Sequence, residues 1–185
     1  MDGAKRQAVI LALLKELRER DSWCGETHVQ KSAHFLQDGL GVPLETEFVM
    51  YKHGPFSFEL RELLGELRTS HLLEVELKPP YGPRLKPTAS GFALMDRFPN
   101  TISRYSRQVK FVADKLGPRD VLALEKIGTA LYVTRQLPTA TQKQRADEIR
   151  QLKPRVDKLT ALAALREVAD LLAEASSSGI EEATA

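Results

Sequence analysis

The sequence predicts a mainly α-helical protein with a small antiparallel β element. One helix is predicted by a stripe of leucines that recur every three or four residues: Leu60, Leu63, Leu64 and Leu67. Residues 72–77 alternate between apolar and charged side chains, which is typical of a strand. A loop rich in proline and glycine follows at 79–83, and residues 84–87 form a short return. Helix, strand, loop and return strand in this order indicate the second half of a winged helix.

A sharp turn is expected just before the leucine stripe. Residues 47–52 are rich in aromatic and branched side chains and are predicted as a strand. Gly54 permits a positive φ, and Pro55 disfavours helix in the residue before it, so the strand should end here. Ser57 is placed to cap a helix over 58–69. Gly54, Pro55 and Ser57 are therefore expected to form a structural turn.

Two further helices are expected ahead of this turn. Residues 4–20 are apolar over more than half of the helix circumference, so we expect this helix at the centre of the core. After a loop, Thr27 can cap a second helix over 28–38. Its buried side would hold Val29, Ala33, Leu36 and Leu40.

The chain after the return strand is predicted to be helical. Thr88 begins a capped helix that ends near Phe98, and its Thr-x-x-Gly start resembles the entry to this helix in many winged-helix regulators. Glycine and proline then separate helices over 102–116, 120–136, 140–152 and 157–175. The last of these should bury Leu162, Leu165, Ala169 and Leu172.

These elements predict two folded parts. A winged helix-turn-helix domain is expected over 1–98, with a helical extension over 99–175 that packs against it. Residues 176–185 contain mostly Ser, Gly, Ala and Glu, so we expect a disordered tail. The single cysteine, Cys24, excludes an internal disulfide and suits the cytoplasm. We expect no signal peptide, because Lys15, Glu16 and Arg18 interrupt the apolar run near the N-terminus too soon. We expect no contact with a membrane, because no run of about 18 apolar residues occurs.

The positive charge is concentrated after the predicted strand. The net charge is only +2, but residues 78–119 hold nine Lys or Arg against two Asp or Glu, a net +7. Residues 1–77 hold nine against thirteen, a net −4. A basic zone of this kind attracts phosphate groups. The candidate nucleic-acid-binding residues lie in the helix over 58–69, in the predicted wing over 72–87 and in the helix over 102–116. They are Arg61, Arg68, Lys78, Arg84, Lys86, Arg104 and Arg107.

Three short motifs add a resemblance to a known family. Residues 29–31 read Val-Gln-Lys, residues 51–57 read Tyr-Lys-His-Gly-Pro-Phe-Ser, and residues 152–154 read Leu-Lys-Pro. With these motifs the chain resembles, over residues 5–172, the YwgA-like family of small bacterial and archaeal proteins, and more distantly the antitoxins related to SocA. The Gly-Pro-Phe-Ser turn is the most specific of them. The resemblance implies a winged-helix fold and a regulatory or defence-linked role.

The sequence does not predict an enzyme. His28 and His34 are six residues apart, which is not the spacing of two metal ligands on a helix. The sequence contains no Cys-x-x-Cys pair, no phosphate-binding Gly-x-x-x-x-Gly-Lys loop and no Gly-x-Ser-x-Gly nucleophile motif. His53 is the best single catalytic candidate, and we interpret it as a surface histidine in a turn. No cofactor and no metal are expected.

Two functions remain open. One is a non-enzymatic regulator that binds double-stranded DNA through the wing and the basic helix after it. The helix over 58–69 would be the recognition helix, which enters the major groove. It carries three acids beside Arg61 and Arg68, and acids disfavour the approach to phosphates. The alternative is a protein-interaction module, such as an antitoxin or an accessory of a defence system. The C-terminal helices would then pack on the first domain or form a homodimer.

Overall fold

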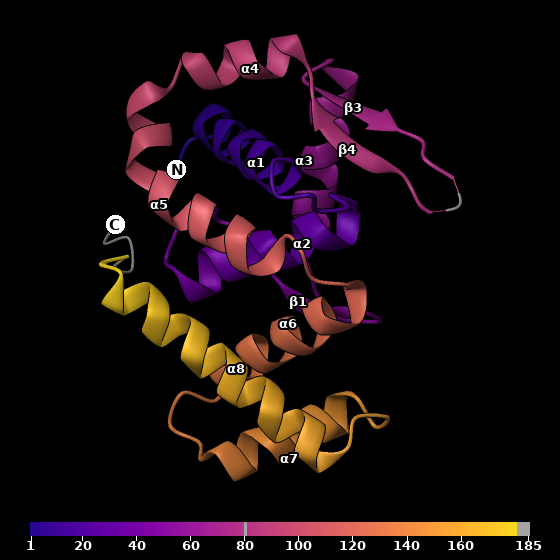
Figure 1. The fold of residues 1–185 in the computed structure, drawn as a ribbon, viewed down its shortest axis with the longest axis vertical. Coiled ribbons are helices and arrows are strands. Elements are labelled where there is room, and N and C mark those ends of the chain that lie inside the picture. The colour runs from indigo at the N-terminus through magenta and orange to yellow at the C-terminus, as the bar shows by residue number, and fades with distance from the viewer. Residues whose placement is uncertain (80, 181–185) are drawn as a thin grey trace.

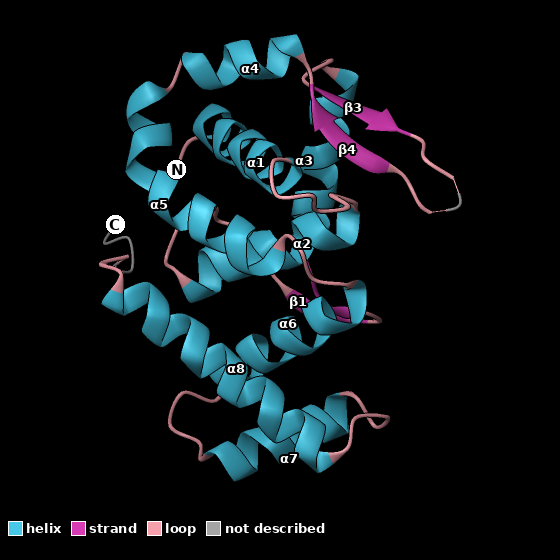
Figure 2. Ribbon diagram, viewed as in Figure 1, coloured by secondary structure: helices cyan, strands magenta, loops and turns pink. Residues whose placement is uncertain are grey.

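The computed structural model describes residues 1–79 and 81–180. The fold is mainly helical with two small antiparallel sheets (Figures 1 and 2). The helices and strands are, in chain order, α1 (Gly3–Arg18), α2 (Glu26–His34), the π-helical turn η1 (Phe35–Gly39), β1 (Val49–Tyr51), β2 (Gly54–Phe56), α3 (Phe58–Thr69), β3 (Leu73–Glu76), β4 (Arg84–Pro87), α4 (Ala89–Asp96), α5 (Pro99–Leu116), α6 (Val121–Gln136), α7 (Gln142–Leu152) and α8 (Lys158–Ser177).

Helix α1 is the centre of the core, as its sequence predicts. Residues 8–14 are all buried, because α2, α4, α5 and β4 pack around it (Figure 1). The second helix also buries the predicted Val29, Ala33, Leu36 and Leu40. Its start differs from the prediction, since Gly25 is the N-cap and Thr27 lies inside the helix. Gly25 has no side chain to cap the helix, and Glu26 in the first turn lies near the positive helix end.

The β3–β4 hairpin follows α3 as predicted. Ser57 caps α3 by accepting a hydrogen bond from the Leu60 backbone N–H, and the leucine stripe is buried. Strands β3 and β4 pair antiparallel in the register Leu73 to Pro87. Thr88 then caps α4 through Gly91, and the hairpin projects from the side of the molecule (Figure 2).

The predicted strand over 47–52 has a partner that the sequence did not suggest. Strand β1 pairs with β2, and Tyr51 lies opposite Gly54. Pro55 therefore does not end the β structure but belongs to the second strand of a hairpin. A proline is tolerated there because a two-stranded sheet leaves one edge of each strand unpaired.

The boundary expected at residue 98 is not a break in the core. Helix α5 packs along α1, and the buried residues form one cluster from Ala8 to Ile180. Helices α6, α7 and α8 pack on one another, and α6 also contacts α2 and β2 (Figure 1). The helical extension thus meets the first 98 residues through α5 and α6.

The predicted buried face of the last helix is confirmed only in part. Helix α8 buries Leu165 as predicted and partly buries Leu162 and Leu172, but Ala169 is exposed. Ala161, Ala164 and Val168 are buried instead, so the inward face is rotated from the predicted one. A helix this rich in Ala and Leu has apolar residues on several faces, and α6 and α7 select which one is buried. The helix also continues to Ser177, into the segment expected to be a disordered tail, and Ile180 is buried. Residues 181–185 of the expected tail lie outside the described residues.

Candidate functional site

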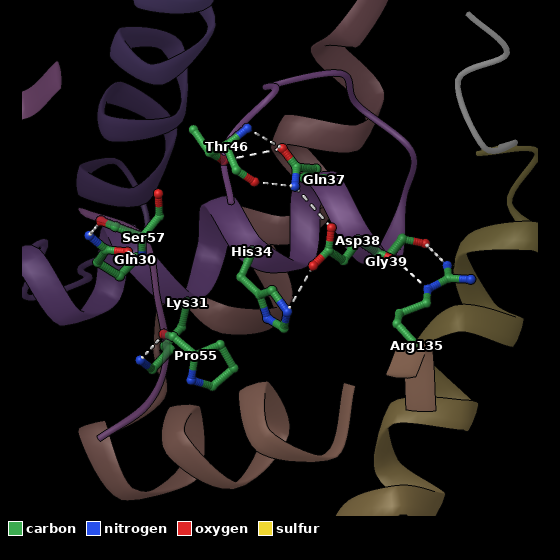
Figure 3. A network of polar contacts seen from close by, with 10 residues as sticks. All are labelled: Gln30, Lys31, His34, Gln37, Asp38, Gly39, Thr46, Pro55, Ser57 and Arg135. Carbon is green, nitrogen blue, oxygen red and sulfur yellow. Dashed lines mark hydrogen bonds and ion pairs between the residues drawn. The ribbon is translucent and has the colours of Figure 1, made fainter. Parts of the chain in front are cut away.

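The β1–β2 hairpin is held by side chains from distant parts of the chain. Gln30 on α2 forms two hydrogen bonds with the Ser57 backbone (Figure 3). Its Nε2 donates to the Ser57 carbonyl oxygen at 2.9 Å, and its Oε1 accepts from the Ser57 N–H at 2.9 Å. Gln30 and Ser57 are both fully buried. The glutamine side chain thus pairs with Ser57 as a neighbouring strand would.

Lys31 holds the same hairpin one residue along α2. Its Nζ donates to the Pro55 carbonyl oxygen at 2.5 Å (Figure 3), and the side chain is almost completely buried. Burial lowers the pKa of Lys31 to about 8; Glu125 opposes this shift and the charge of Lys153 adds to it. No pattern in the sequence predicted that this lysine lies inside the protein.

Lys153, in the linker after α7, binds the end of β1 and the turn of the hairpin. Its Nζ donates to the carbonyl oxygens of Lys52 at 2.6 Å and Tyr51 at 3.2 Å. It also forms an ion pair of 2.7 Å with Glu125 on α6. We call Gln30, Lys31 and Lys153 the hairpin clamp.

The hairpin clamp unites the three motifs seen in the sequence. The Val-Gln-Lys motif supplies Gln30 and Lys31, the Leu-Lys-Pro motif supplies Lys153, and the Gly-Pro-Phe-Ser turn is what they bind. Gly54 has a φ of +81°, and a Cβ there would lie 3.2 Å from the Thr129 hydroxyl. Glycine thus permits both the turn and the close approach of α6. The predicted structural turn of Gly54, Pro55 and Ser57 is a docking point between the two halves of the chain.

Further polar side chains extend this network along α2 and η1 (Figure 3). Gln37 accepts hydrogen bonds from the Thr46 N–H and hydroxyl, and donates to the Thr46 carbonyl oxygen. His34 is fully buried with Nε2 3.1 Å from the Asp38 carboxylate, and burial lowers the His34 pKa. Arg135 on α6 donates to the carbonyl oxygens of Asp38 and Gly39. All of these contacts join elements of the fold to one another.

Four of the predicted DNA-binding residues form hydrogen bonds or ion pairs with other parts of the protein. Arg84 is half-buried: its Nε donates to the Trp23 carbonyl oxygen at 3.1 Å, and its guanidinium lies 5.2 Å from the Trp23 ring centroid. Lys86 pairs with Glu74 across the β3–β4 hairpin at 2.9 Å. Arg61 pairs with Glu26 at 3.2 Å. Arg107 donates to the Ser178 carbonyl oxygen beside the end of α8.

The remaining three are exposed. The side chains of Arg68 and Lys78 make no hydrogen bond or ion pair with other residues among 1–79 and 81–180. Arg104 lies with its guanidinium 5.5 Å from the ring centroid of Tyr105.

The basic zone of the sequence is divided in space. Arg84 contacts the segment that follows the C-terminal end of α1, while Arg104 lines a hollow with Met1 and Asp2 at the opposite end. The 16 residues of α1 separate these ends by about 24 Å at 1.5 Å per residue. Helix α4 and the start of α5 connect these two regions of the chain (Figure 1). The β3–β4 hairpin and α5 therefore present two separate sets of cations.

An exposed aromatic cluster lies where the predicted recognition helix begins. The rings of Tyr51, Phe56 and Phe58 lie 5.1 to 5.7 Å apart in tilted or edge-on contact. Tyr51 is 46% exposed and Phe58 is 49% exposed. Sequence reasoning missed this cluster, because it assigned these rings to a strand and a helix start without placing them together.

Cys24 and His53 have different surroundings in the structure. Cys24 is buried, and burial raises the pKa of its thiol to about 12. His53 is 76% exposed, with Nδ1 3.7 Å from Glu125. Within the described part of the chain, no three His, Cys, Asp or Glu side chains are grouped to hold a metal ion. No helix in this part has the length and apolar character needed to cross a bilayer.

Comparison with known proteins places this chain in no family. No family model matches it, and no curated protein matches it either.

Proposed function

We propose that this protein is a non-enzymatic protein-interaction module built on a winged-helix scaffold. The observation that carries the proposal is the exposed aromatic cluster of Tyr51, Phe56 and Phe58 beside α3. Aromatic side chains that remain exposed and grouped are typical of protein-binding surfaces.

The winged-helix assignment is supported by the order of elements around α3. Helix α3 is followed by the β3–β4 hairpin as a wing would be. The Leu85 N–H donates to the Cys24 carbonyl oxygen at 2.8 Å, so the segment between α1 and α2 lies beside β4. A longer link than a simple turn joins α2 to α3, and it contains the β1–β2 hairpin. The proposed kinship with the YwgA-like family is supported by the hairpin clamp, which gives its three motifs a common structural purpose.

Electrostatics favour a protein partner over DNA. Glu62 and Glu66 are exposed on α3, and Glu59 is exposed while accepting a hydrogen bond from the Glu47 N–H at 2.9 Å. Carboxylates on this helix would face phosphates if it entered the major groove. Arg61 already pairs with Glu26 and lies over the Phe56 ring. DNA binding through the wing remains the competing proposal, supported by Lys78 at its tip and Arg68 on α3.

The test is a complex rebuilt from purified components. Tagged full-length protein is used to isolate partners, and each partner is purified and mixed with it again. The double variant Tyr51→Ser with Phe58→Ser should weaken the complex at least about tenfold, because it removes two exposed rings from the interface. Leu77→Ser is the matched control, since Leu77 is 78% exposed on the wing.

DNA binding is tested in parallel by a gel shift with random duplex at low and moderate salt. The competing proposal predicts salt-sensitive binding that falls in Arg68→Ala with Lys78→Ala. That result, together with no complex that depends on the aromatic cluster, would overturn the protein-interaction proposal. Arg84 is a poor choice for this test, because its loss would also disturb the fold.

A further inference from the structure

A second surface lies on the other side of the β1–β2 hairpin, between its turn and the three C-terminal helices. It is a groove of about 530 Å³. Its apolar lining comes from α6, α7, α8 and the linker between the last two: Leu122, Ile149, Leu152, Val156, Ala161 and Ala164. A volume of this size is typical of specific binding sites. The groove shares Tyr51 with the aromatic cluster but is otherwise made of different residues.

The charges at the groove are almost all positive. Lys52, Lys126 and Arg155 line it, are exposed, and make no hydrogen bond or ion pair through their side chains with another described residue. The one acidic lining residue is Glu125, which already pairs with Lys153 at 2.7 Å. The groove thus has an apolar interior and three cations available to a ligand.

The apolar surface does not stop at the edge of the groove. Leu122 is 67% exposed, and Tyr51 is 46% exposed at the hairpin. Leu159 is also exposed and lies next to the lining residue Thr160 in sequence. A small molecule enclosed in the groove would leave these side chains in water, whereas a polypeptide could cover them.

We propose that the groove binds an acidic amphipathic segment of a partner protein. Apolar side chains of that segment would fill the groove and cover Leu122, and its carboxylates would pair with Lys52, Lys126 and Arg155. Opposite charges of this kind orient the segment and raise its association rate. The inference rests on the proposed function and adds the chemistry of the partner and a second contact surface.

The test selects ligands from a random library of peptides of about 12 residues displayed on phage, with the full-length protein as bait. We expect the enriched peptides to combine Leu, Ile or Phe with Asp and Glu. Synthetic copies should bind at least about tenfold more weakly to Lys126→Glu with Arg155→Glu, and to Leu122→Asp. The exposed cations Lys110 and Lys143 lie outside the groove lining, so Lys110→Glu with Lys143→Glu is the matched control and should bind normally.

The outcomes separate this inference from the proposed function. If no peptide is enriched, if the enriched peptides are not acidic, or if charge reversal at the groove has no effect, the inference is wrong. A purified partner complex that depends on Tyr51 and Phe58 would then still support the proposed function. Binding of decanoate in the groove, without any peptide binding, would instead identify a small amphipathic anion and also overturn the inference. The melting temperature of each variant checks that it is folded. It should stay close to that of the unchanged protein, because all five substituted residues are exposed.

Discussion

The side-chain amide of Gln30 satisfies both backbone groups of Ser57, with two hydrogen bonds of 2.9 Å across 27 residues of sequence. Both residues are fully buried, so water cannot replace these bonds. An unpaired buried polar group costs about 1–3 kcal/mol. Gln30→Ala would leave the Ser57 N–H unpaired, whereas the Ser57 carbonyl oxygen would keep its hydrogen bond from the Arg61 N–H. We therefore expect the free energy of unfolding to fall by about 1–3 kcal/mol. Urea denaturation followed by circular dichroism measures this change.

Gln151 provides the control for the Gln30 experiment. It is exposed on α7 and makes no hydrogen bond through its side chain with another described residue. Gln151→Ala should change the free energy of unfolding by no more than about 0.5 kcal/mol. Equal effects of the two substitutions would show that the pairing of Gln30 with Ser57 contributes little to stability.

Arg84 and Lys86 are close in sequence, and we expect opposite results from them. Arg84→Ala removes a hydrogen bond to the Trp23 carbonyl and a contact with the Trp23 ring, which should cost about 1–2 kcal/mol. Lys86→Ala removes only an exposed ion pair with Glu74, which should cost about 0–0.5 kcal/mol. Thermal melts of the two single variants test this. A melting temperature unchanged in Arg84→Ala would contradict a structural role for Arg84.

Lys31 should make stability depend on alkaline pH. Its pKa is about 8 in the folded protein against an ordinary 10.5, so between these values the unfolded chain binds more protons on this lysine. Stability therefore rises with pH through this window, by an upper limit of about 3 kcal/mol. The effect is isolated by comparing the protein with Lys31→Met, which cannot titrate. The stability of the protein relative to this variant should increase from pH 8 to pH 10, and a constant difference would contradict a lowered pKa.

Features that depend on neighbouring residues were predictable from the sequence. The leucine stripe of α3, the Ser57 and Thr88 caps and the return strand β4 each arise from a short pattern. The β1–β2 hairpin was not predictable in the same way. Pro55 favours breaking a strand locally, while Gln30, Lys31 and Lys153, which hold it in place, come from distant positions.

The positions of the candidate DNA-binding residues were also not predictable from the sequence. Net charge along the chain suggested one basic zone. In the structure α4 carries α5 away from the β3–β4 hairpin, so Arg84 and Arg104 lie near opposite ends of α1. Which cations remain available also depends on contacts made after folding. Arg84 and Arg107 look alike in the sequence, and in the structure both bind backbone carbonyl oxygens.

Gly91 should tolerate no side chain, because α4 begins directly against the strand pair. A Cβ at Gly91 would lie 2.3 Å from the Leu72 carbonyl oxygen, which also accepts a hydrogen bond from the Thr88 N–H. That oxygen cannot move away without breaking this bond, so Gly91→Ala should cost about 2–3 kcal/mol. This explains the glycine in the Thr-x-x-Gly start of α4.

Gly65 offers the matched comparison within α3. A Cβ there would meet nothing within 4 Å, and alanine favours a helix interior over glycine by about 0.5–1 kcal/mol. Gly65→Ala should therefore raise the free energy of unfolding while Gly91→Ala lowers it, as measured by urea denaturation. Opposite signs for the same chemical change would show that the close approach of α4 to Leu72, and not helix propensity, sets the requirement at Gly91. A stabilising Gly91→Ala would mean that α4 does not approach the strand pair this closely.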